Sequence, residues 1–465
     1  MSWTLPEILA ASGGELVRWG AGPFTSVSTD SRRTVAGDVF VALRGPRFDG
    51  HEFVGEALAR GAGAAVVEQE TAPAGASACI RVGETLRALG DLAAAWRRRL
   101  AVRIVGVTGS NGKTTTKEMI AAVLGAGGAR VAKSRGTENN LIGVPQTLLR
   151  LTGEEAFAVL EMGMNHPGEI WRLAEIARPD VGVITNVGPA HLEGLGSLAN
   201  VAAAKEELAL ALASTATLVV NAADPRLKSI AGRFPGRVIA AGEGTIRARQ
   251  VSPLPEGQRL EIEVEGHKAT VDLAIRGAHN VDNALLAVAV GVAFELPIEV
   301  IVAGLSRFTP PPMRLEAVRL SNGARILNDA YNANPASMEA ALAALGAEAG
   351  RRRIAVLGEM WELGEASAHY HREVGAAAQR LGVDLLVAVG THAEALAAGA
   401  LEAGMAAPAV ERLATAADAA HWLAAHLESD DVVLIKGSRA AKMEQILERL
   451  RVPETNFVPS REDIR

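Results

Sequence analysis

The residues from Gly106 to Thr115 carry the strongest chemical signal in the sequence. They read Gly-Val-Thr-Gly-Ser-Asn-Gly-Lys-Thr-Thr, follow an apolar run and precede a helix-like stretch, which is the context of a phosphate-binding loop. Glycines let backbone N–H groups turn toward phosphate oxygens, and the N-terminus of the following helix adds its dipole. We expect Lys113 to reach the β- and γ-phosphates of a nucleotide, and the Thr114 hydroxyl to coordinate Mg²⁺. The predicted nucleotide-binding residues of this loop are Gly109, Ser110, Asn111, Gly112, Lys113, Thr114 and Thr115.

This loop departs from the strict phosphate-loop pattern at one position. The strict pattern places a glycine where Val107 stands, and the nearest glycines are Gly106 and Gly109. The alternative is an ordinary glycine-rich turn between a strand and a helix. The Lys-Thr-Thr sequence and the two flanking elements favour a phosphate loop.

Three further polar residues follow the loop in sequence order. Glu161 comes directly after the apolar run Ala158–Leu160, His191 follows the run Val181–Ile184, and Lys205 stands in a helix-like stretch. Side chains at the carboxyl ends of parallel strands face the ligand crevice of an open α/β sheet. Taken alone, each could instead be a surface or capping glutamate, a structural turn histidine and a solvated helical lysine.

The elements that must position these residues are parallel strands and crossover helices. Short apolar runs such as Arg103–Val107, Ile354–Leu357 and Val432–Ile435 alternate with longer stretches rich in Ala and Leu. Continuous β-branched runs of this length are typical of parallel strands buried on both faces. The sequence therefore predicts an α/β fold with parallel sheets. One stretch, from Arg247 to Ile275, shows the period-2 pattern of half-buried strands instead.

Three domains are predicted along the 465 residues. The first is a small α/β domain over residues 1–82, and the second is a central domain over 83–312 that contains the phosphate loop in a mostly parallel sheet. Consecutive prolines at 310–312 cannot enter a helix or a central strand, so they mark the second boundary. The third is a Rossmann-like α/β domain over 313–465.

Composition excludes several classes of function. A net charge of -6 and a pI near 6.0 argue against a nucleic-acid partner. The single cysteine, Cys79, rules out a disulfide within one chain and is expected to be a small core residue. Neither a signal peptide nor an apolar run of membrane-spanning length is evident, so we expect no membrane insertion and a cytoplasmic location.

The sequence from Thr108 to Thr115 resembles the ATP loop of the Mur ligases and of the related folylpolyglutamate synthases. The ordered set Glu161, His191 and Lys205 resembles the central domain of the Mur ligases. The resemblance implies ATP and Mg²⁺ as cofactors, and carbamylation of the lysine so that its new carboxylate holds a second metal. A carbamate would turn a cation into an oxygen ligand, which two phosphate-bound metals need. The implied metal ligands are Thr114, Glu161, His191 and Lys205.

Residues further along the chain also match motifs of this family. The resemblance implies that Asn283 contacts adenine, Asp329 binds the ribose, and Arg314 comes from the C-terminal side to the ATP phosphates. It places Asn139 and Asn140 beside the reacting centre, and it assigns a substrate motif to the last domain. The plain alternatives are an Asn-rich turn, a helix cap and a solvated turn. The residues of the C-terminal motif are Lys436, Ser438 and Arg439.

The two terminal domains indicate the branch of the family. Asp30, Ser31 and Arg32, together with Gly37–Phe40, resemble the UDP-sugar-binding domain that tripeptide- and pentapeptide-forming Mur ligases share, although a plain turn is the alternative. The stretch Tyr331–Glu339, which contains the predicted substrate residues Asn332 and Asn334, resembles the branch that adds D-alanyl-D-alanine. So does the stretch from Leu357 to Gly364. The Asp-Asn-Pro-Arg motif of the diamino-acid-adding branch is absent from the C-terminal domain.

The activity implied by this resemblance is ATP-dependent ligation of a carboxylate to an amine. The terminal carboxylate of UDP-N-acetylmuramoyl-tripeptide would attack the γ-phosphate, and the amine of D-alanyl-D-alanine would then attack the acyl phosphate. The implied catalytic residues are Lys113, His191, Lys205 and Arg314, in an enzyme expected to be a monomer. Two alternatives stay open: a family member that adds a diamino acid, and a phosphate-loop ATPase or binding module that makes no bond.

Overall fold

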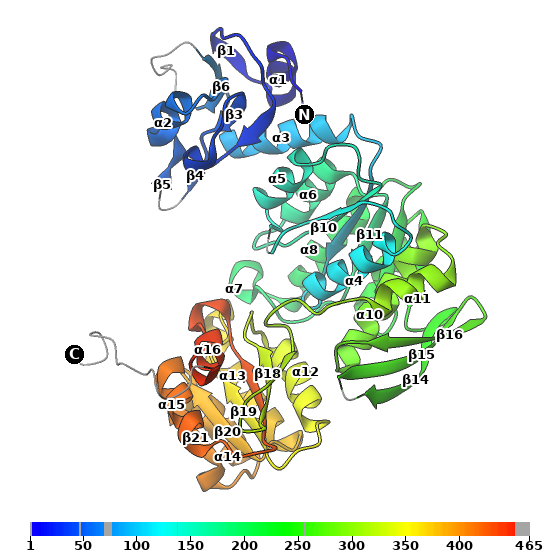
Figure 1. Ribbon diagram of the computed structural model, residues 1–465, viewed down its shortest axis with the longest axis vertical. Coiled ribbons are helices and arrows are strands. Elements are labelled where there is room, and N and C mark those ends of the chain that lie inside the picture. Colours follow the sequence, from blue (N-terminus) through cyan, green and yellow to red (C-terminus); the bar gives the residue numbers. More distant parts are fainter. Residues whose placement is uncertain (1, 46–47, 69–76, 137, 255, 452–465) are drawn as a thin grey trace.

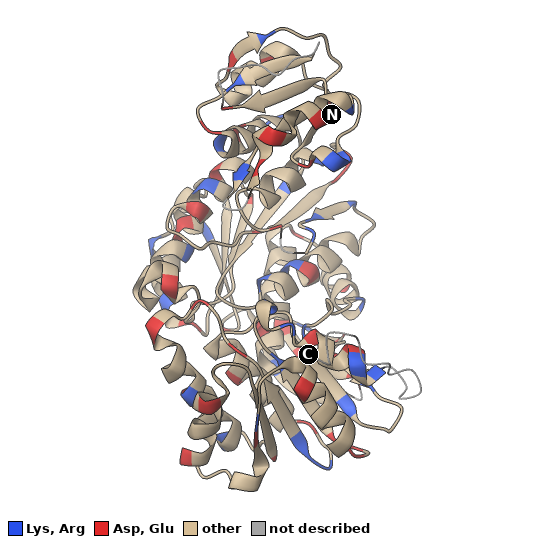
Figure 2. Cartoon of the chain, turned by 90° about the vertical axis from the view of Figure 1, so that its left-hand side faces the viewer, with Lys and Arg blue, Asp and Glu red and all other residues tan. Residues whose placement is uncertain are grey.

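Three sheet-containing domains follow one another along the long axis of the molecule (Figure 1). The computed structural model describes residues 2–45, 48–68, 77–136, 138–254 and 256–451. Within these ranges no helix has the length and hydropathy needed to cross a bilayer. Figure 2 shows Lys and Arg interspersed with Asp and Glu over the whole length of the chain. The three-domain α/β architecture confirms the predicted fold class.

The N-terminal sheet has the strand order β1-β7-β6-β3-β2, in which only β1 runs antiparallel to its neighbour. Val39 and Val41 pack on the α1 side with Ile8, whereas Phe40 packs on the α2 side with Val54. Cys79 is completely buried in this sheet, as predicted. The elements are α1 (Leu5–Ser12), β1 (Glu15–Arg18), β2 (Ser26–Ser28), β3 (Asp38–Val41), β4 (Arg44–Gly45), β5 (Phe48–Asp49), α2 (Val54–Ala59), β6 (Ala64–Val67) and β7 (Ala78–Arg81).

Helix α3 (Thr85–Arg97) connects the first two domains. It contacts α1 of the N-terminal domain, and it also packs on α5 and α6 of the central domain. Trp96 near its end lies 5.7 Å from Trp3, measured between ring centroids, and donates its indole N–H to the Leu151 carbonyl at 3.0 Å. Because α3 packs against both domains, it fixes the orientation of the N-terminal domain relative to the central one.

The central sheet is fully parallel and has the order β13-β12-β11-β8-β10-β9. Both of its faces are buried, because Val105 and Val107 pack toward α4 and α10 while Ile104 packs toward α3 and α5. The elements are β8 (Arg103–Thr108), α4 (Lys113–Gly125), β9 (Val131–Lys133), α5 (Gly143–Leu149), β10 (Phe157–Glu161), α6 (Glu169–Ala177), β11 (Val181–Ile184), α7 (Leu192–Leu195), α8 (Leu198–Ala211), β12 (Thr217–Asn221), α9 (Pro225–Arg233), β13 (Arg237–Ala241), α10 (Ala278–Ala293) and α11 (Ile298–Ser306).

The topology of this sheet opens a crevice beside β8. The chain leaves β8 for the edge strand β9, and only later returns to place β10 and β11 on either side of β8. Ligands of open α/β sheets bind at such a switch point, beyond the carboxyl ends of the strands. The phosphate loop, Glu161 and His191 all follow these three strands.

A smaller antiparallel sheet belongs to the central domain. It contains β14 (Ile246–Leu254), β15 (Gly257–Val264) and β16 (His267–Leu273). Along β15 the side chains alternate between buried Leu260 and exposed Glu261, which confirms the period-2 prediction for this region.

The C-terminal sheet has the order β17-β18-β22-β19-β20-β21, with β17 antiparallel. Leu357 packs on one face with Met338 of α12, and Val356 packs on the other with Leu423 of α15. The three prolines at 310–312 lie in the irregular segment before β17. The elements are β17 (Glu316–Arg319), β18 (Arg325–Asp329), α12 (Pro335–Gly346), β19 (Arg353–Leu357), α13 (Ser367–Arg380), β20 (Leu385–Val389), α14 (Ala393–Glu402), β21 (Val410–Leu413), α15 (Ala416–His426), β22 (Val432–Lys436) and α16 (Glu444–Arg451).

Candidate active site

A cavity of about 400 Å³ lies where the central and C-terminal domains meet. We call it the junction cavity. Its walls come from the loops after β8, β10 and β11 on one side, and from the loops after β18, β19 and β22 on the other. Fourteen of the residues predicted from sequence line it: Ser110, Asn111, Gly112, Lys113, Thr114, Asn139, Asn140, Glu161, His191, Arg314, Asn332, Asn334, Ser438 and Arg439.

At two positions of the phosphate loop, the backbone conformation and the surrounding space permit only glycine. Gly109 has a φ of 143° and Gly112 a φ of 79°. A Cβ at Gly109 would lie 1.9 Å from the Thr185 hydroxyl oxygen, and one at Gly112 would lie 2.4 Å from the Asn283 Oδ1. The glycine that this loop needs is therefore Gly109, which explains why Val107 is tolerated at the position of the strict pattern.

The Lys113 ammonium folds back over the loop. Its Nζ donates to the carbonyl oxygens of Gly109 at 2.8 Å and of Ser110 at 3.2 Å. Burial lowers the pKa of Lys113, while the carboxylate of Glu161 opposes this shift and the charge of Arg314 adds to it. A cation held above backbone N–H groups at a helix N-terminus forms an anion site.

Glu161 is buried, not a surface residue. Its carboxylate accepts a hydrogen bond from the Thr114 hydroxyl at 2.9 Å and another from the Asn139 amide at 2.9 Å. The Lys117 ammonium lies 3.7 Å from it, and both side chains are at most 2% exposed. Lys117 was not predicted as a site residue, since nothing in the sequence separates it from a solvated helical lysine.

Asn139 and Asn140 have different partners: Asn139 contacts the site, and Asn140 binds the backbone of the residues that follow it. Asn139 donates to Glu161, whereas the Asn140 side chain accepts the backbone N–H groups of Ile142 and Gly143 at 3.1 and 2.9 Å. The Asn-rich turn that was the plain alternative is therefore present, and it also serves the carboxylate. Thr137 of the same motif lies outside the described residues.

The donors around Glu161 fit a magnesium ion that takes part of its ligands from a nucleotide. A hydroxyl and a carboxylate lie 2.9 Å apart at the mouth of the phosphate loop, and oxygen donors are what Mg²⁺ prefers. Among the described residues, no three His, Cys, Asp or Glu side chains are grouped closely enough to hold a metal ion. Mg²⁺ keeps water and phosphate oxygens in such sites, so a sparse set of protein ligands suits it.

Lys205 is buried, so the alternative interpretation of this residue as a solvated helical lysine is wrong. Its side chain on α8 is completely buried, and no atom of the described chain forms a hydrogen bond with its Nζ. Burial lowers the pKa of Lys205 well below its usual range, and the nearby charge of Lys113 lowers it further, with Glu207 opposing. Both effects favour the neutral amine, which is the form that reacts with carbon dioxide.

His191 forms a contact across the domain boundary. Its Nδ1 lies 2.6 Å from a carboxylate oxygen of Glu362 in the C-terminal domain. The hydrogen bond from His191 lowers the pKa of Glu362, which burial opposes. Both residues have a positive φ, 56° and 64°, and such strained backbone is concentrated at functional sites. Glu362 was quoted from sequence only within the stretch Leu357–Gly364 and was not selected as a site residue.

Two other C-terminal residues reach the phosphate loop. The Arg314 guanidinium lies 4.0 Å above the Tyr331 ring and donates to the Thr114 hydroxyl at 3.4 Å. The Asn334 amide donates to Asn111 Oδ1 at 2.7 Å. The structure thus brings together residues that are 200 and 223 positions apart in the chain.

A second cavity, of about 240 Å³, lies behind the phosphate loop and is called the α10 cavity. Asn283, Asp329 and Lys436 line it together with Thr115. Asn283 also joins two helices, because its Oδ1 accepts from the Thr116 hydroxyl at 3.1 Å. Lys436 donates to Asp329 Oδ2 at 2.6 Å, so it lies with the predicted ribose ligand and not with Ser438 and Arg439.

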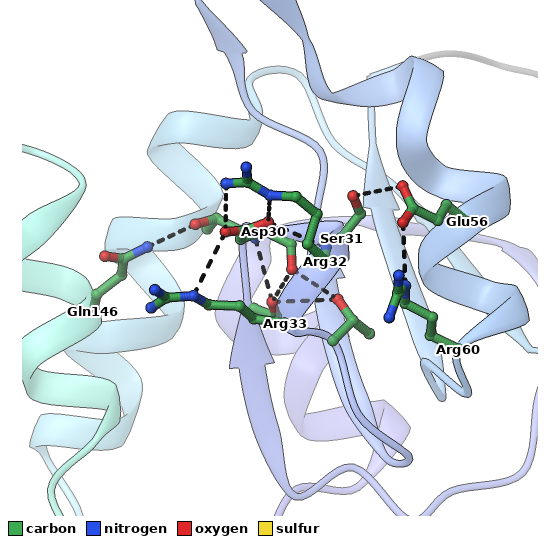
Figure 3. A network of polar contacts seen from close by, with 10 residues as sticks. Asp30, Ser31, Arg32, Arg33, Glu56, Arg60 and Gln146 are labelled. Carbon is green, nitrogen blue, oxygen red and sulfur yellow. Dashed lines mark hydrogen bonds and ion pairs between the residues drawn. The ribbon is translucent and has the colours of Figure 1, made fainter.

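Asp30, Ser31 and Arg32 lie in the N-terminal domain, away from both cavities (Figure 3). The Asp30 carboxylate accepts from the Arg32 backbone at 3.1 Å and forms an ion pair with the Arg32 side chain at 2.8 Å. The Arg32 side chain lowers the pKa of Asp30. The Ser31 hydroxyl donates to Glu56 at 2.9 Å. The plain turn that was the alternative is therefore present, and Gln146 of α5 joins it to the central domain by donating to the Thr29 hydroxyl at 2.6 Å.

A buried carboxylate holds the two larger domains together behind the α10 cavity. Glu348, with a side chain 2% exposed, is paired with Arg276 of the central domain and with Arg325 of β18. Replacing Glu348 by alanine should lower the free energy of unfolding by about 2 kcal/mol, because two partly buried guanidinium groups lose a shared partner. In thermal unfolding followed by circular dichroism this corresponds to a decrease in melting temperature of about 4–8 °C.

A matched control for this substitution is Glu339→Ala on α12. Glu339 forms an exposed ion pair with Arg380, at 57% and 61% exposure of the two side chains. Exposed pairs contribute about 0–1 kcal/mol, so this variant should melt close to the wild type. Equal melting temperatures for the two variants would contradict the role assigned to Glu348.

Three protein-family models match successive parts of the chain. The family described as "Mur ligase family, catalytic domain" matches residues 23–97, "Mur ligase middle domain" matches 107–291, and "Mur ligase, glutamate ligase domain" matches 313–439. These matches fall on the three large sheets, with β1 (Glu15–Arg18) before the first match.

Individual proteins are similar over nearly the whole chain. The UDP-N-acetylmuramoyl-tripeptide--D-alanyl-D-alanine ligase of Bacillus subtilis is 38% identical over 91% of this chain and 92% of its own length. A crystal structure of MurF from Acinetobacter baumannii superimposes with a TM-score of 0.90 at 33% identity, covering 97% and 99% of the two chains. The MurF ligase from Thermotoga maritima, solved in complex with ADP, has a TM-score of 0.83 at 30% identity and covers 92% and 97%.

Proposed function

Because the chain belongs to the Mur ligase family, we propose that it uses ATP to join UDP-N-acetylmuramoyl-tripeptide to D-alanyl-D-alanine, a step of peptidoglycan precursor synthesis. The product is the UDP-linked pentapeptide, released with ADP and phosphate. The observation that carries this proposal is the junction cavity, in which a phosphate loop faces groups from a second domain.

ATP is assigned to the two adjoining cavities. The α10 cavity suits the adenosine part, with Asn283 toward the base and the Asp329 carboxylate toward the ribose hydroxyls. The phosphates then extend over the loop to Lys113, where Arg314 approaches from the C-terminal domain. Phosphoryl transfer depends mainly on positioning and charge neutralisation, and these two cations supply both.

Magnesium is assigned to the oxygen donors beside the loop. Thr114 and Glu161 would hold one ion, while His191 and a carbamylated Lys205 would complete the set of ligands. When bound, Mg²⁺ supplies neutralisation of the triphosphate charge. The burial of the Lys205 amine and its lowered pKa support carbamylation, because a protonated amine does not react with carbon dioxide.

The contact between the two larger domains protects the intermediate. A carboxylate that attacks the γ-phosphate gives an acyl phosphate, which water would hydrolyse. The pairs His191–Glu362 and Asn111–Asn334 fasten the cavity on opposite sides, and such closure excludes water. The amine of D-alanyl-D-alanine would enter from the C-terminal side, where Asn332, Ser438 and Arg439 line the wall.

The N-terminal domain is assigned to the UDP end of the substrate. We place this domain at residues 1–82, the ATP domain at 83–312 and the acceptor domain at 313–465. Asp30, Ser31 and Arg32 are the proposed contacts with the UDP-sugar. The proposed oligomeric state is a monomer.

The choice of amine can be tested by measuring ADP release with a panel of acceptors. In the presence of UDP-N-acetylmuramoyl-tripeptide, D-alanyl-D-alanine should stimulate ADP release at least about 100-fold more than lysine or meso-diaminopimelate at equal concentration. A site that hydrogen-bonds its acceptor discriminates by at least this amount. Preference for a diamino acid would assign the chain to the other branch of the family.

A further inference from the structure

The loop after β19 brings two side chains to the junction cavity. Trp361 and Glu362 both line the cavity. Besides the contact of its carboxylate with His191, Glu362 accepts the backbone N–H of Glu193 through its own carbonyl at 3.1 Å. This loop therefore provides two of the contacts between the two halves of the cavity.

The loop is also bound by a histidine, His371, which has no part in the proposed reaction. His371 lies on α13 and its side chain is completely buried. The backbone N–H of Met360 donates to His371 Nε2 at 2.9 Å, two residues before Glu362. On the opposite side of the ring, Nδ1 lies 2.7 Å from the Ser367 carbonyl oxygen.

The two contacts determine the tautomer of the ring. A carbonyl oxygen can only accept, so Nδ1 carries the hydrogen, and Nε2 offers its lone pair to Met360. Burial lowers the pKa of His371, and the neighbouring His392 ring, stacked at 4.4 Å between centroids, lowers it further. The Ser367 carbonyl and Glu359 oppose this shift. The imidazole is thus neutral at pH 7, as an acceptor must be.

Other hydrogen bonds of the loop come from the segments that follow β22 and β20. Ser438, after β22, accepts the Trp361 N–H at 2.9 Å and donates its own N–H to the Glu359 carbonyl at 2.8 Å. Thr391, after β20, donates its backbone N–H to the Glu359 carboxylate at 2.7 Å. Among the described hydrogen bonds, Met360 N–H to His371 is the one that joins this segment to α13.

We propose that His371 is a positioning residue for the ligation: by accepting the Met360 N–H it fixes the loop that presents Glu362 to His191 and Trp361 to the cavity. This inference rests on the proposed function. His371 touches neither cavity, so it acts only through the loop. The residues assigned to adenosine, Asn283 and Asp329, are held by separate contacts. Loss of the acceptor should therefore lower kcat and leave the KM for ATP unchanged.

The test compares His371→Met, which has similar bulk but no strong acceptor, with His371→Gln, whose amide oxygen can accept the Met360 N–H. Ligation of D-alanyl-D-alanine by the full chain is measured under steady-state conditions. We expect kcat of H371M to fall about 10- to 30-fold, the equivalent of one buried hydrogen bond, with the KM for ATP within about twofold of wild type. H371Q should recover most of the rate.

The control is His369→Met on the same helix, where the side chain is 66% exposed and should be replaceable without effect. Wild-type rates in H371M, or equal losses in H371M and H371Q, would overturn the positioning role. A rise in the KM for ATP that matches the fall in kcat would also overturn it. The proposed function fails separately, if the wild-type chain does not ligate D-alanyl-D-alanine.

Discussion

Replacing Lys113 by alanine is expected to abolish ligation while UDP-precursor binding is retained. The Lys113 Nζ lies over the phosphate loop, 2.8 Å from the Gly109 carbonyl, where it would meet the β- and γ-phosphates. Removing this charge takes away neutralisation that increases in the transition state, so kcat should fall at least about 1000-fold. ADP release measures the loss, and calorimetric titration with UDP-N-acetylmuramoyl-tripeptide measures binding.

The matched control for Lys113 is another lysine of the same domain. Lys133, on β9, is 48% exposed and pairs with Glu118, so Lys133→Ala should ligate at nearly the wild-type rate. The proposed UDP-sugar residues Asp30 to Arg32 lie in the N-terminal domain, whereas Lys113 begins α4 of the central domain. A Lys113→Ala protein that folds but no longer binds the UDP precursor would show that the domain assignment is wrong.

The second large effect is expected at Lys205. If its buried amine is carbamylated, Lys205→Ala removes a carboxylate beside the phosphates, and ligation should fall at least about 100-fold. Formate or acetate should restore part of the activity, because a small carboxylate can enter the space that the shortened side chain leaves. The same acids should not restore Lys113→Ala, which lacks a cation. Rates are followed by ADP release at increasing acid concentration.

Carbamylation also makes the wild-type enzyme depend on carbon dioxide. Dialysis into buffer free of carbon dioxide should lower the rate, and bicarbonate should restore it. A Lys205→Ala variant with wild-type activity, or a wild-type rate that is independent of bicarbonate, would contradict the assignment. The buried amine without a hydrogen-bond partner would then need another explanation.

The fold was predictable because its main signals are local. Runs such as Val432–Ile435 are apolar at every position, which only a strand covered on both faces requires, and alternate residues do pack on opposite faces. The phosphate loop was also predictable, since glycine, lysine and threonine stand between a strand and a helix. The structure adds why the glycines stand at 109 and 112: side chains of Thr185 and Asn283 occupy the space of a Cβ.

Much of the candidate site could not be predicted in this way, because it depends on contacts between domains. Arg314 and Thr114 are 200 positions apart, and no local pattern brings them together. Lys436 was grouped with Ser438 and Arg439 by sequence, yet it pairs with Asp329, because the two residues lie opposite each other at the ends of the neighbouring strands β22 and β18, whereas Ser438 and Arg439 lie beyond the end of β22. The roles given to these residues stay predictions.

Other residues were missed because their types have no characteristic pattern. Lys117 and His371 are helical residues with polar neighbours, and their burial is visible only in three dimensions. Glu362 lies in a loop whose backbone at this position has a φ of 64°. A buried lysine or histidine needs a partner, and these partners lie in other elements: Lys117 donates to the Ser134 carbonyl and lies 3.7 Å from Glu161, and His371 accepts the Met360 N–H.

The central claim, that the chain forms an amide bond between a carboxylate and an amine, is tested most directly by the mass of the product. The purified chain is incubated with ATP, Mg²⁺, UDP-N-acetylmuramoyl-tripeptide and D-alanyl-D-alanine, and the mixture is analysed by mass spectrometry. We expect a species whose mass is the sum of the masses of the two peptide substrates less one water, and which forms in an amount equal to that of ADP. ATP hydrolysis that proceeds equally without D-alanyl-D-alanine, with no such species, would contradict it.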